Sequence, residues 1–539
     1  MLGICPTRVF FIARRVAAAL GRFSRLCNIA RVVKESPAPL APGFLFFLTH
    51  DTIKPMSNIE DLRADREKKI ASLQELGINP YPSKANTTHK VSEVLVNFDD
   101  LNTSQKEVTV AGRIMAMREH GALAFIDVMD GTGKIQGFCQ KDELGEELFD
   151  RLLGTMSTGD FIEITGTAYV TKRETQAILV KNWRVLGKAL QNIPSEHFGI
   201  KDEDERYRKR YLDLLLDNET RDMFVKKAKF WDVTRAFMKR RGFLEVETPT
   251  LEHTTGGAEA RPFKTHHNDF DINVYLRISI GELWHKRLMA GGFDKTFEIG
   301  RAYRNEGTSP EHLQEFTNLE FYWAYADYKD GMKLVRELYI EIAKEVFGTT
   351  EFEARGHKFN LADEWVEIDY AEEIEKQTGL DIITASEDDM KVKLEELSVQ
   401  YEGDNRERLT DTLWKYCRKN ISGPAFLVNH PKLVAPLAKA RPDGQTVEMF
   451  QPIIAGSEVG RGYSELNDPI DQRERFEVQR KLLEAGDEEA MMPDFEFVEM
   501  LEYGMPPTCG FGFGERLFAF LAGKPLRETQ LFPLMRPKE

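Results

Sequence analysis

The spacing of apolar and polar positions changes several times along the chain, and each spacing predicts a different element. Residues 59–77 are rich in helix-forming residues and stop at Gly77, which predicts a helix. Between residues 107 and 186 the apolar runs become short and β-rich, at Val108–Val110, Leu123–Val128, Lys134–Phe138, Phe161–Thr165 and Ala177–Val180. Five short strands over about 80 residues, with a turn at Asp130-Gly131, are typical of a small barrel such as an OB-fold.

The rest of the chain mixes helices with strands. Residues 219–241 predict a helix, because apolar positions recur at helical spacing on one face: Phe224, Ala228, Trp231, Thr234 and Met238. Apolar strands then alternate with loops to the C-terminus. Residues 187–218 are charged and are interpreted as a connector, and residues 330–445 as a helical insertion. The pattern predicts an α+β protein with a helical segment at 56–106, a barrel at 107–186 and a second domain at 219–539.

The first 55 residues differ from the body in charge. They hold eight basic and two acidic side chains, so they carry +6 in a chain whose net charge is −15. One interpretation is a disordered leader or an over-extended start, with Met56 as the true first residue, in a cytoplasmic protein. The alternative is an organellar transit peptide, because the segment is rich in arginine, poor in acidic residues and amphipathic.

Composition narrows the class of protein. Of the 539 residues, 42% are hydrophobic and 30% charged, which is typical of globular domains. No apolar run reaches about 18 residues, so we expect no membrane-spanning helix. The five cysteines form no CxxC pair, which leaves a disulfide framework or a cysteine zinc site unsupported.

One candidate site lies at Phe297–Gly307 and continues to His312 and Phe316. An apolar strand here delivers Arg304 and Glu306 to a turn. Arg304 can hold phosphoryl oxygens with two parallel hydrogen bonds, and Phe316 can stack on a base. The alternative is a surface strand with a solvated ion pair.

Two further segments carry candidate chemistry. Gly510, Gly512 and Gly514 alternate with phenylalanines before Arg516, which fits a strand whose glycine face lets a ligand approach the backbone; a plain turn is the alternative. Several carboxylates stand among apolar residues, together with Tyr322, Tyr463 and Asn467: Glu282, Glu320, Glu458 and Glu465. Two such groups in one pocket would require a cation, although each alone can be a surface charge.

These segments together resemble class II aminoacyl-tRNA synthetases. Gly242–Pro249 resembles the first motif of that class, the segment around Arg304 the second, and Gly510–Arg516 the third. A finer resemblance, to the lysyl-tRNA synthetase family, rests on Arg206–Leu214, Gly256–Phe263, Thr265–His267, Phe321–Tyr328, Gly462–Asp468 and Leu531–Pro537. The likeness extends from about residue 58 to the C-terminus.

The resemblance implies an OB-fold that binds the anticodon, followed by an antiparallel-sheet catalytic domain with flanking helices. It implies ligation of L-lysine to tRNA(Lys) with ATP and Mg²⁺, by a homodimer. The matching ATP positions are Arg304, Glu306, His312, Phe316 and Arg516, with Arg304 and Arg516 catalytic. The matching lysine positions are Gly257, Glu282, Glu320, Tyr322, Tyr463 and Glu465. Phe125 and Gln136, with Arg113 nearby, match the anticodon site, and Glu458 matches a magnesium ligand.

The chain departs from the family pattern at a few positions. Arg461 stands where Asn is usual, and Gln451 stands where a second metal-binding Glu is usual, which puts the number of magnesium ions in doubt. Rival functions are an aspartyl- or asparaginyl-tRNA synthetase, a ligase that lysylates an elongation factor, or an inactive nucleic-acid-binding paralogue. An anionic substrate would require a cation where the glutamates stand, and loss of Arg304 or Arg516 would indicate inactivity.

Overall fold

The computed structural model describes residues 59–194, 200–258, 260–307, 309, 312–401, 403, 405–486 and 490–538. The chain divides into two compact units, residues 1–193 and 194–539. The expected leader at 1–55 lies outside the described residues. Within the described residues, none of the helices combines the length and apolarity that a bilayer crossing requires.

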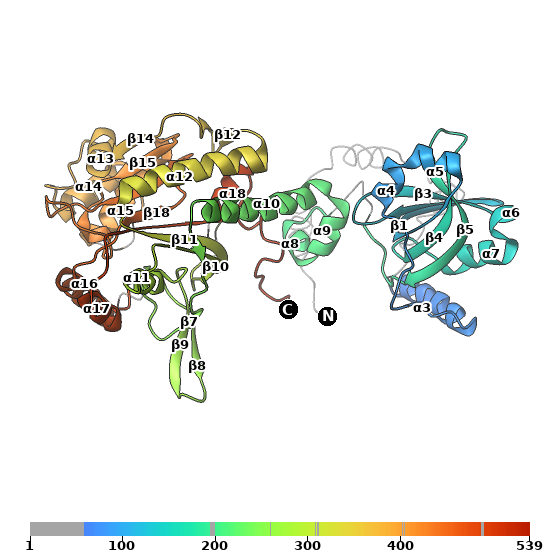
Figure 1. The fold of residues 1–539 in the computed structure, drawn as a ribbon, viewed down its shortest axis with the longest axis horizontal. Coiled ribbons are helices and arrows are strands. Elements are labelled where there is room, and N and C mark those ends of the chain that lie inside the picture. The colour runs from blue at the N-terminus through green and yellow to red at the C-terminus, as the bar shows by residue number, and fades with distance from the viewer. Residues whose placement is uncertain are drawn as a thin grey trace, which may run out of the picture. The chain divides into compact units, whose positions relative to one another are not determined.

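The first unit is a closed five-stranded barrel in the order β1-β2-β3-β5-β4 (Figure 1). Its strands are β1 Glu107–His120, β2 Leu123–Met129, β3 Lys134–Gln140, β4 Phe161–Val170 and β5 Gln176–Gly187. Its helices are α3 Ile59–Glu75, α4 Val91–Val96, α5 Phe98–Ser104, α6 Lys141–Leu144 and α7 Glu146–Thr155. On β2, Ala124, Ile126 and Val128 are fully buried and alternate with outward residues, as the side-chain period of a strand requires. The expected OB-fold barrel is confirmed.

The second unit is built on a nine-stranded sheet in the order β14-β15-β16-β18-β19-β11-β10-β6, with β17 paired to β16. The central pairs are antiparallel, and the edge pairs β6·β10 and β14·β15 are parallel. Its strands are β6 Leu244–Glu245, β10 Lys295–Tyr303, β11 Glu315–Ala324, β14 Val366–Asp369, β15 Ala425–Val428, β16 Met449–Ile454, β17 Ser457–Glu458, β18 Arg461–Ser464 and β19 Thr508–Gly514. The expected α+β class is confirmed.

Helices cover both faces of this sheet. Figure 1 shows α10 (Asn218–Arg240) and α12 (Tyr328–Ile342) along one face, with α11 (Glu282–Ala290) on the other. The α10 and α12 face is the main apolar core, where Phe230 and Leu338 pack with Phe321, Phe511 and Phe513 of the strands. The α11 face carries the polar side chains described below. The smaller elements of this unit are β7 Leu251–Glu252, β8 Lys264–His267, β9 Ile272–Leu276, α16 Pro469–Glu484, α17 Phe495–Glu502 and α18 Arg516–Leu521.

The range 330–445, expected as a helical insertion, has a mixed role. Three of its helices form a separate apolar cluster: α13 Tyr370–Thr378, α14 Glu387–Glu396 and α15 Arg406–Cys417. The same range also supplies most of α12 and the strands β14 and β15, which extend the central sheet, and the hairpin β12 Glu351–Ala354 and β13 His357–Asn360. The sequence pattern did not separate these, because four-residue strands carry too few positions to show their period.

The charged range 187–218, expected as a connector, contains two short helices, α8 Glu203–Arg208 and α9 Arg210–Leu216. Arg210 is fully buried and donates hydrogen bonds to the carbonyls of Glu528, Gln530 and Leu531 near the C-terminus. Its NH1 also lies 2.6 Å from Asp213. This buried cation therefore ties the segment to the C-terminal end of the second unit.

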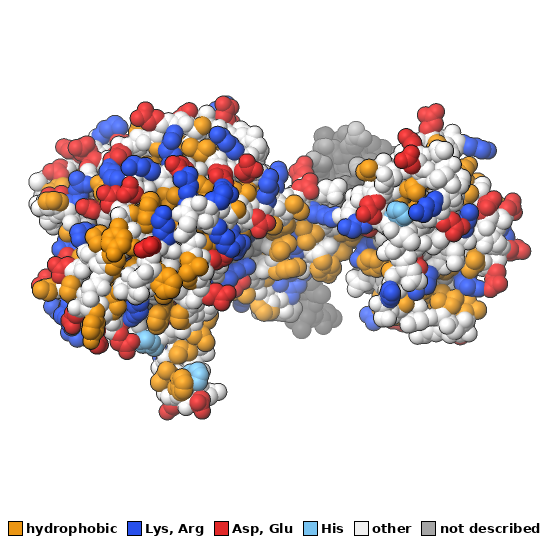
Figure 2. Space-filling model, viewed as in Figure 1, with side chains coloured by type: hydrophobic (Ala, Val, Ile, Leu, Met, Phe, Trp, Pro, Cys, Tyr) orange, Lys and Arg blue, Asp and Glu red, His pale blue; other side chains and the backbone are white. Residues whose placement is uncertain are grey.

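Acidic and basic side chains are interspersed over the faces of both units in the view of Figure 2. The net charge of −15 is therefore not gathered into one acidic field on the faces shown.

Candidate active site

The glycine strand β19 makes room for polar side chains on the α11 face of the sheet. Gly510 and Gly512 pair with Tyr322 and Glu320 of β11. A Cβ atom on Gly510 would lie 2.0 Å from Glu465 Oε1, and one on Gly512 would lie 2.9 Å from Glu320 Cγ. Glycine is therefore required at alternate positions because carboxylate side chains occupy the space above the strand.

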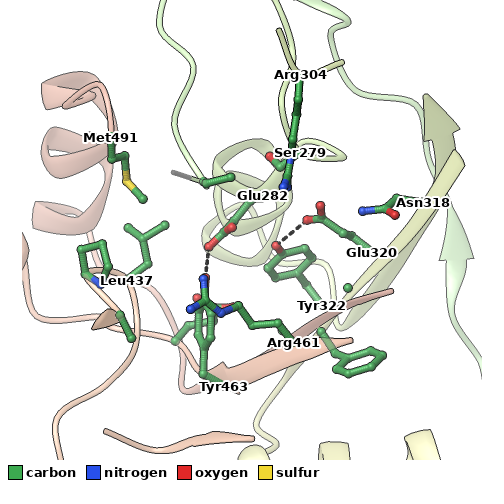
Figure 3. Close-up of a pocket in the computed structure, with 18 residues that line it drawn as sticks. Ser279, Glu282, Arg304, Asn318, Glu320, Tyr322, Leu437, Arg461, Tyr463 and Met491 are labelled. Atoms are coloured by element: carbon green, nitrogen blue, oxygen red, sulfur yellow. Dashed lines mark hydrogen bonds between the residues drawn. The ribbon is translucent and has the colours of Figure 1, made fainter. Parts of the chain in front are cut away.

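A cavity of about 140 Å³ lies on this face (Figure 3). Its lining includes all six residues expected to bind lysine: Gly257, Glu282, Glu320, Tyr322, Tyr463 and Glu465. Figure 3 shows two hydrogen-bonded pairs at the cavity, Glu282 with Tyr463 and Glu320 with Tyr322, and apolar side chains, Leu437 among them, on the side away from Glu320. The fold thus brings three carboxylates, distant in the sequence, into one cavity lining.

Glu320 is held in place by two donors. Its Oε1 accepts a hydrogen bond from the Ile280 amide at 2.7 Å, and its Oε2 accepts one from the Tyr322 hydroxyl at 3.0 Å. Burial, together with the neighbouring Glu282 carboxylate, raises the pKa of Glu320 to about 7. Among the described residues no cation forms an ion pair with Glu320, so its charge is open to a ligand.

Sequence reasoning did not identify Lys286, which pairs with the other two carboxylates. Its Nζ lies 2.8 Å from Glu282 Oε1 and 2.6 Å from Glu465 Oε2, and the side chain is 1% exposed. Glu282 Oε1 also accepts a hydrogen bond from the Tyr463 hydroxyl. Burial raises the pKa of Glu465 to about 8, although Lys286 opposes that rise. The available signal was the spacing of four residues between Glu282 and Lys286 on one helix.

A second cavity of about 430 Å³ adjoins the first, and the two share Arg304, Asn318, Arg461 and Gly512 in their linings. The second lining includes all the expected ATP-binding residues: Arg304, Glu306, His312, Phe316 and Arg516. The Arg304 guanidinium lies 5.4 Å from the centre of the Phe316 ring. This cavity is therefore a cationic cleft with an aromatic surface on which a base can stack.

Arg461, one of the departures from the family pattern, lies where the two cavities meet. It begins β18, pairs with Gly512 and donates a hydrogen bond to the Val434 carbonyl at 3.3 Å. With Arg304 it places two guanidinium groups in both linings.

The expected magnesium ligand, Glu458, also lines the cationic cleft, as does Gln451. Glu458 Oε1 accepts a hydrogen bond from Trp414 Nε1 at 2.6 Å, and Gln451 Oε1 lies 2.8 Å from His430 Nε2. Within the described ranges no group of three or more His, Cys, Asp and Glu side chains could hold a metal ion. One carboxylate suits Mg²⁺ that is bound mainly by nucleotide phosphates, since Mg²⁺ often takes only one or two protein carboxylates.

The expected anticodon residues lie on the barrel. Phe125 and Gln136 are half-buried on its outer surface, and Phe125 stacks on Phe138 with ring centres 5.0 Å apart. The side-chain amide of Gln136 donates a hydrogen bond to Asp127, which also forms an ion pair with Arg118.

Arg113 does not lie beside Phe125 and Gln136. In the β1–β2 ladder it pairs with Met129, and its guanidinium lies 4.3 Å from the centre of the Phe161 ring. Arg118, directly opposite Phe125, is the nearer cation and was missed.

Comparisons with known proteins agree with this division of the chain. Residues 202–536 match the model of tRNA synthetases class II (D, K and N), and residues 108–186 match that of the OB-fold nucleic acid binding domain. The chain is 41% identical over 488 residues to a lysine–tRNA ligase of Thermotoga maritima, covering 89% of this chain and 97% of the relative. It is 41% identical over 488 residues to that of Roseiflexus sp. strain RS-1, covering 89% and 100%. With the lysine–tRNA ligase of Halalkalibacterium halodurans it shares 40% identity over 495 residues, covering 89% and 98%.

Proposed function

The chain belongs to the family of class II tRNA synthetases for D, K and N, and from this premise we propose that it is a lysine–tRNA ligase. It activates lysine with ATP and transfers the lysyl group to the 3′ end of tRNA(Lys). One observation carries the choice of amino acid: a cavity lined by three carboxylates adjoins a cleft lined by arginines. An ammonium group in such a cavity is paired, whereas the carboxylate of aspartate would be repelled.

The first step joins lysine to the nucleotide. The lysine carboxylate attacks the α-phosphorus of ATP in line, and pyrophosphate leaves. Arg304 and Arg461, at the junction of the two cavities, hold the carboxylate and the α-phosphate together, and Arg516 stabilises charge on the phosphates. Glu458 would hold Mg²⁺ in the cationic cleft, where the ion would neutralise part of the charge of the ATP phosphates.

The second step transfers the lysyl group to the terminal ribose hydroxyl of the tRNA and releases AMP. No covalent enzyme intermediate is required, so positioning and charge stabilisation supply the catalysis. Phe125 stacks on an anticodon base while Gln136 reads a base edge, in the way that unpaired bases are recognised. The acidic net charge is compatible with tRNA binding, since contacts need only local basic patches.

Assembly and location complete the proposal. We expect a homodimer, because the segment Gly242–Pro249 resembles the motif that forms the dimer interface in this class. Sedimentation that finds a fully active monomer of 61.8 kDa would contradict it. The proposed location is the cytoplasm, or an organelle if residues 1–55 act as a transit peptide.

ATP–pyrophosphate exchange with each amino acid in turn tests the function. Lysine should support exchange, and aspartate and asparagine should not. Arg516→Ala should lower the lysine-dependent rate by about 10²–10³-fold, the usual cost of losing one preorganised donor. Exchange with aspartate or asparagine in place of lysine would show that the assigned amino acid is wrong.

A further inference from the structure

Lys286 lies behind the amino-acid cavity. Its ammonium contacts one carboxylate from its own helix, Glu282, and one from the segment after β18, Glu465. The Tyr463 and Phe497 rings lie 5.5 and 5.8 Å from Nζ. With 1% of its side chain exposed, Lys286 lies outside the set of described residues that line the cavity. It can therefore act on a ligand only through the carboxylates.

The charges of this cluster match the proposed substrate. The three cavity carboxylates, Glu282, Glu320 and Glu465, carry −3 when ionised, and Lys286 reduces this to −2. Lysine brings two ammonium groups, and its carboxylate would pair with Arg304 of the same lining. Without Lys286, one buried carboxylate would have no cation even when lysine is bound, and an unpaired buried charge is strongly unfavourable.

We propose that Lys286 is a positioning residue for amino-acid recognition: it holds the Glu282 and Glu465 carboxylates in place and offsets one of the negative charges of the cavity, which leaves charge for the two ammonium groups of lysine. This inference rests on the proposed function and adds to it the residue that controls the charge of the site. Lys286 acts as a permanent internal cation, so the ligand has to supply only the remaining two.

Other charged and titratable groups surround the cluster, and they do not replace Lys286. Arg277 is buried but pairs with Glu298 at 2.6 Å, and Arg287 pairs with Asp494 at 2.9 Å. The elements packed around the cluster carry further titratable or charged side chains. They are Glu252 of β7, His285 of α11, Tyr322 of β11, Tyr463 of β18, Cys509 of β19, and Arg304 and Arg461 at the junction of the two cavities. Burial lowers the pKa of His285 to about 3, so this ring is neutral and supplies no positive charge.

Removal of the internal cation should make lysine binding sensitive to protons. Because an adjacent cation favours the ionised form of a carboxylate, losing Lys286 raises the pKa of Glu465 above its present value of about 8. Lysine binding must then displace this proton up to a higher pH than in the wild type. A purely structural role for Lys286 would instead raise the lysine KM by the same factor at every pH.

The test uses Lys286→Met, which keeps the length of the side chain and removes its charge. The lysine KM in pyrophosphate exchange is measured on the full chain from about pH 6 to about pH 8.5, well below the titration of the side-chain amino group of lysine. The expected result is a KM at least about tenfold higher at neutral pH, with the midpoint of its pH dependence shifted upward by at least about one unit. The ATP KM should change little. Lys188→Met, the same change at a buried lysine of the barrel unit, is the control and should leave the lysine KM unchanged.

A second variant keeps the test decisive if Lys286→Met folds poorly. The double variant Glu282→Gln/Lys286→Met removes one carboxylate with the cation, so the ionised cavity again carries −2 and both charges are paired when lysine is bound. Its midpoint should return to within about half a unit of the wild type. A wild-type midpoint in Lys286→Met, or a double variant as shifted as the single, would overturn the inference. Failure of the wild-type chain to use lysine would instead refute the proposed function.

Discussion

Each unit of the molecule buries a lysine, and the two lysines differ in what surrounds them. Lys188 of the barrel is fully buried and contacts Asp160. That carboxylate also accepts hydrogen bonds from the amides of Ser157 and Ala189, at 2.7 and 2.8 Å, and lies 3.5 Å from Arg66. This cluster therefore has two cations, Lys188 and Arg66, for one carboxylate, and both oxygens of Asp160 accept hydrogen bonds from within the unit.

The cluster around Lys286 has the opposite balance. One ammonium faces two carboxylates, and a third carboxylate, Glu320, stands at the same cavity. The pKa values follow this difference: burial lowers the pKa of Lys188 although Asp160 opposes it, whereas at Lys286 burial is outweighed by Glu282 and Glu465, which raise the pKa. A buried cluster without surplus negative charge stabilises the fold, while one with surplus charge beside a cavity is suited to bind a cationic ligand.

The largest effect is expected where the barrel cluster is broken. Asp160→Asn removes the counter-ion of Lys188 and Arg66, and breaking a buried pair from one side typically costs about 3–5 kcal/mol. Urea denaturation of the variant should show this loss for the unfolding of the barrel unit, while the lysine KM in pyrophosphate exchange stays at its wild-type value. An altered lysine KM would show that the two clusters are not functionally separate.

Breaking the cavity cluster should affect binding instead of stability. Glu320→Gln keeps the shape and removes the one cavity carboxylate that has no cation partner among the described residues. The lysine KM should rise by about 10²-fold, because a hydrogen bond to a charged group contributes about 1.5–3 kcal/mol. Glu252→Gln is the matched control, since Glu252 is buried and bonded to Trp284 but outside the described cavity lining. Equal KM changes in both variants would refute the pocket assignment.

The barrel is expected to bind its ligand through surface rings and not through its buried charges. Phe125→Ala should weaken tRNA charging by about 1–3 kcal/mol, the contribution of one base–aromatic stack. Lysine-dependent pyrophosphate exchange, which needs no tRNA, should remain nearly unchanged. If both activities fall equally, Phe125 acts through the fold of the barrel, and the assignment of tRNA binding to its surface rings is wrong.

The smallest effect concerns pH in the unmodified protein. The pKa of Glu320 is raised to about 7, so the carboxyl is neutral below that pH and ionised above it. Lysine binding below about pH 7 must displace the proton, so the lysine KM should rise by up to about tenfold for each pH unit of further acidification. Glu320→Gln should weaken this dependence, and the contribution of Glu465, whose pKa is about 8, should remain. A lysine KM independent of pH between about pH 6 and pH 8 would contradict the raised pKa.

Much of the architecture followed from local patterns. The five barrel strands, the helix α10 and the glycine strand β19 were all predicted, since each has enough residues to show its period. The residue types of the site were also predicted, and the fold brings all six expected lysine-pocket residues to one cavity. The four-residue strands β14 and β15 were missed. Arg113 was grouped with Phe125, although this β1 residue pairs with Met129, at the other end of β2 from Phe125.

The sequence by itself determined which side chains carry chemistry and that β19 needs glycine on one face. The tertiary structure alone decided that Glu282, Glu320 and Glu465 share a cavity and that Lys286 neutralises one of their charges. The reason is physical: these groups come from α11, β11 and the end of β18, and the free energy of a buried charge depends on its burial and on the distance to its neighbours. Neither quantity can be read from the spacing of residues along the chain.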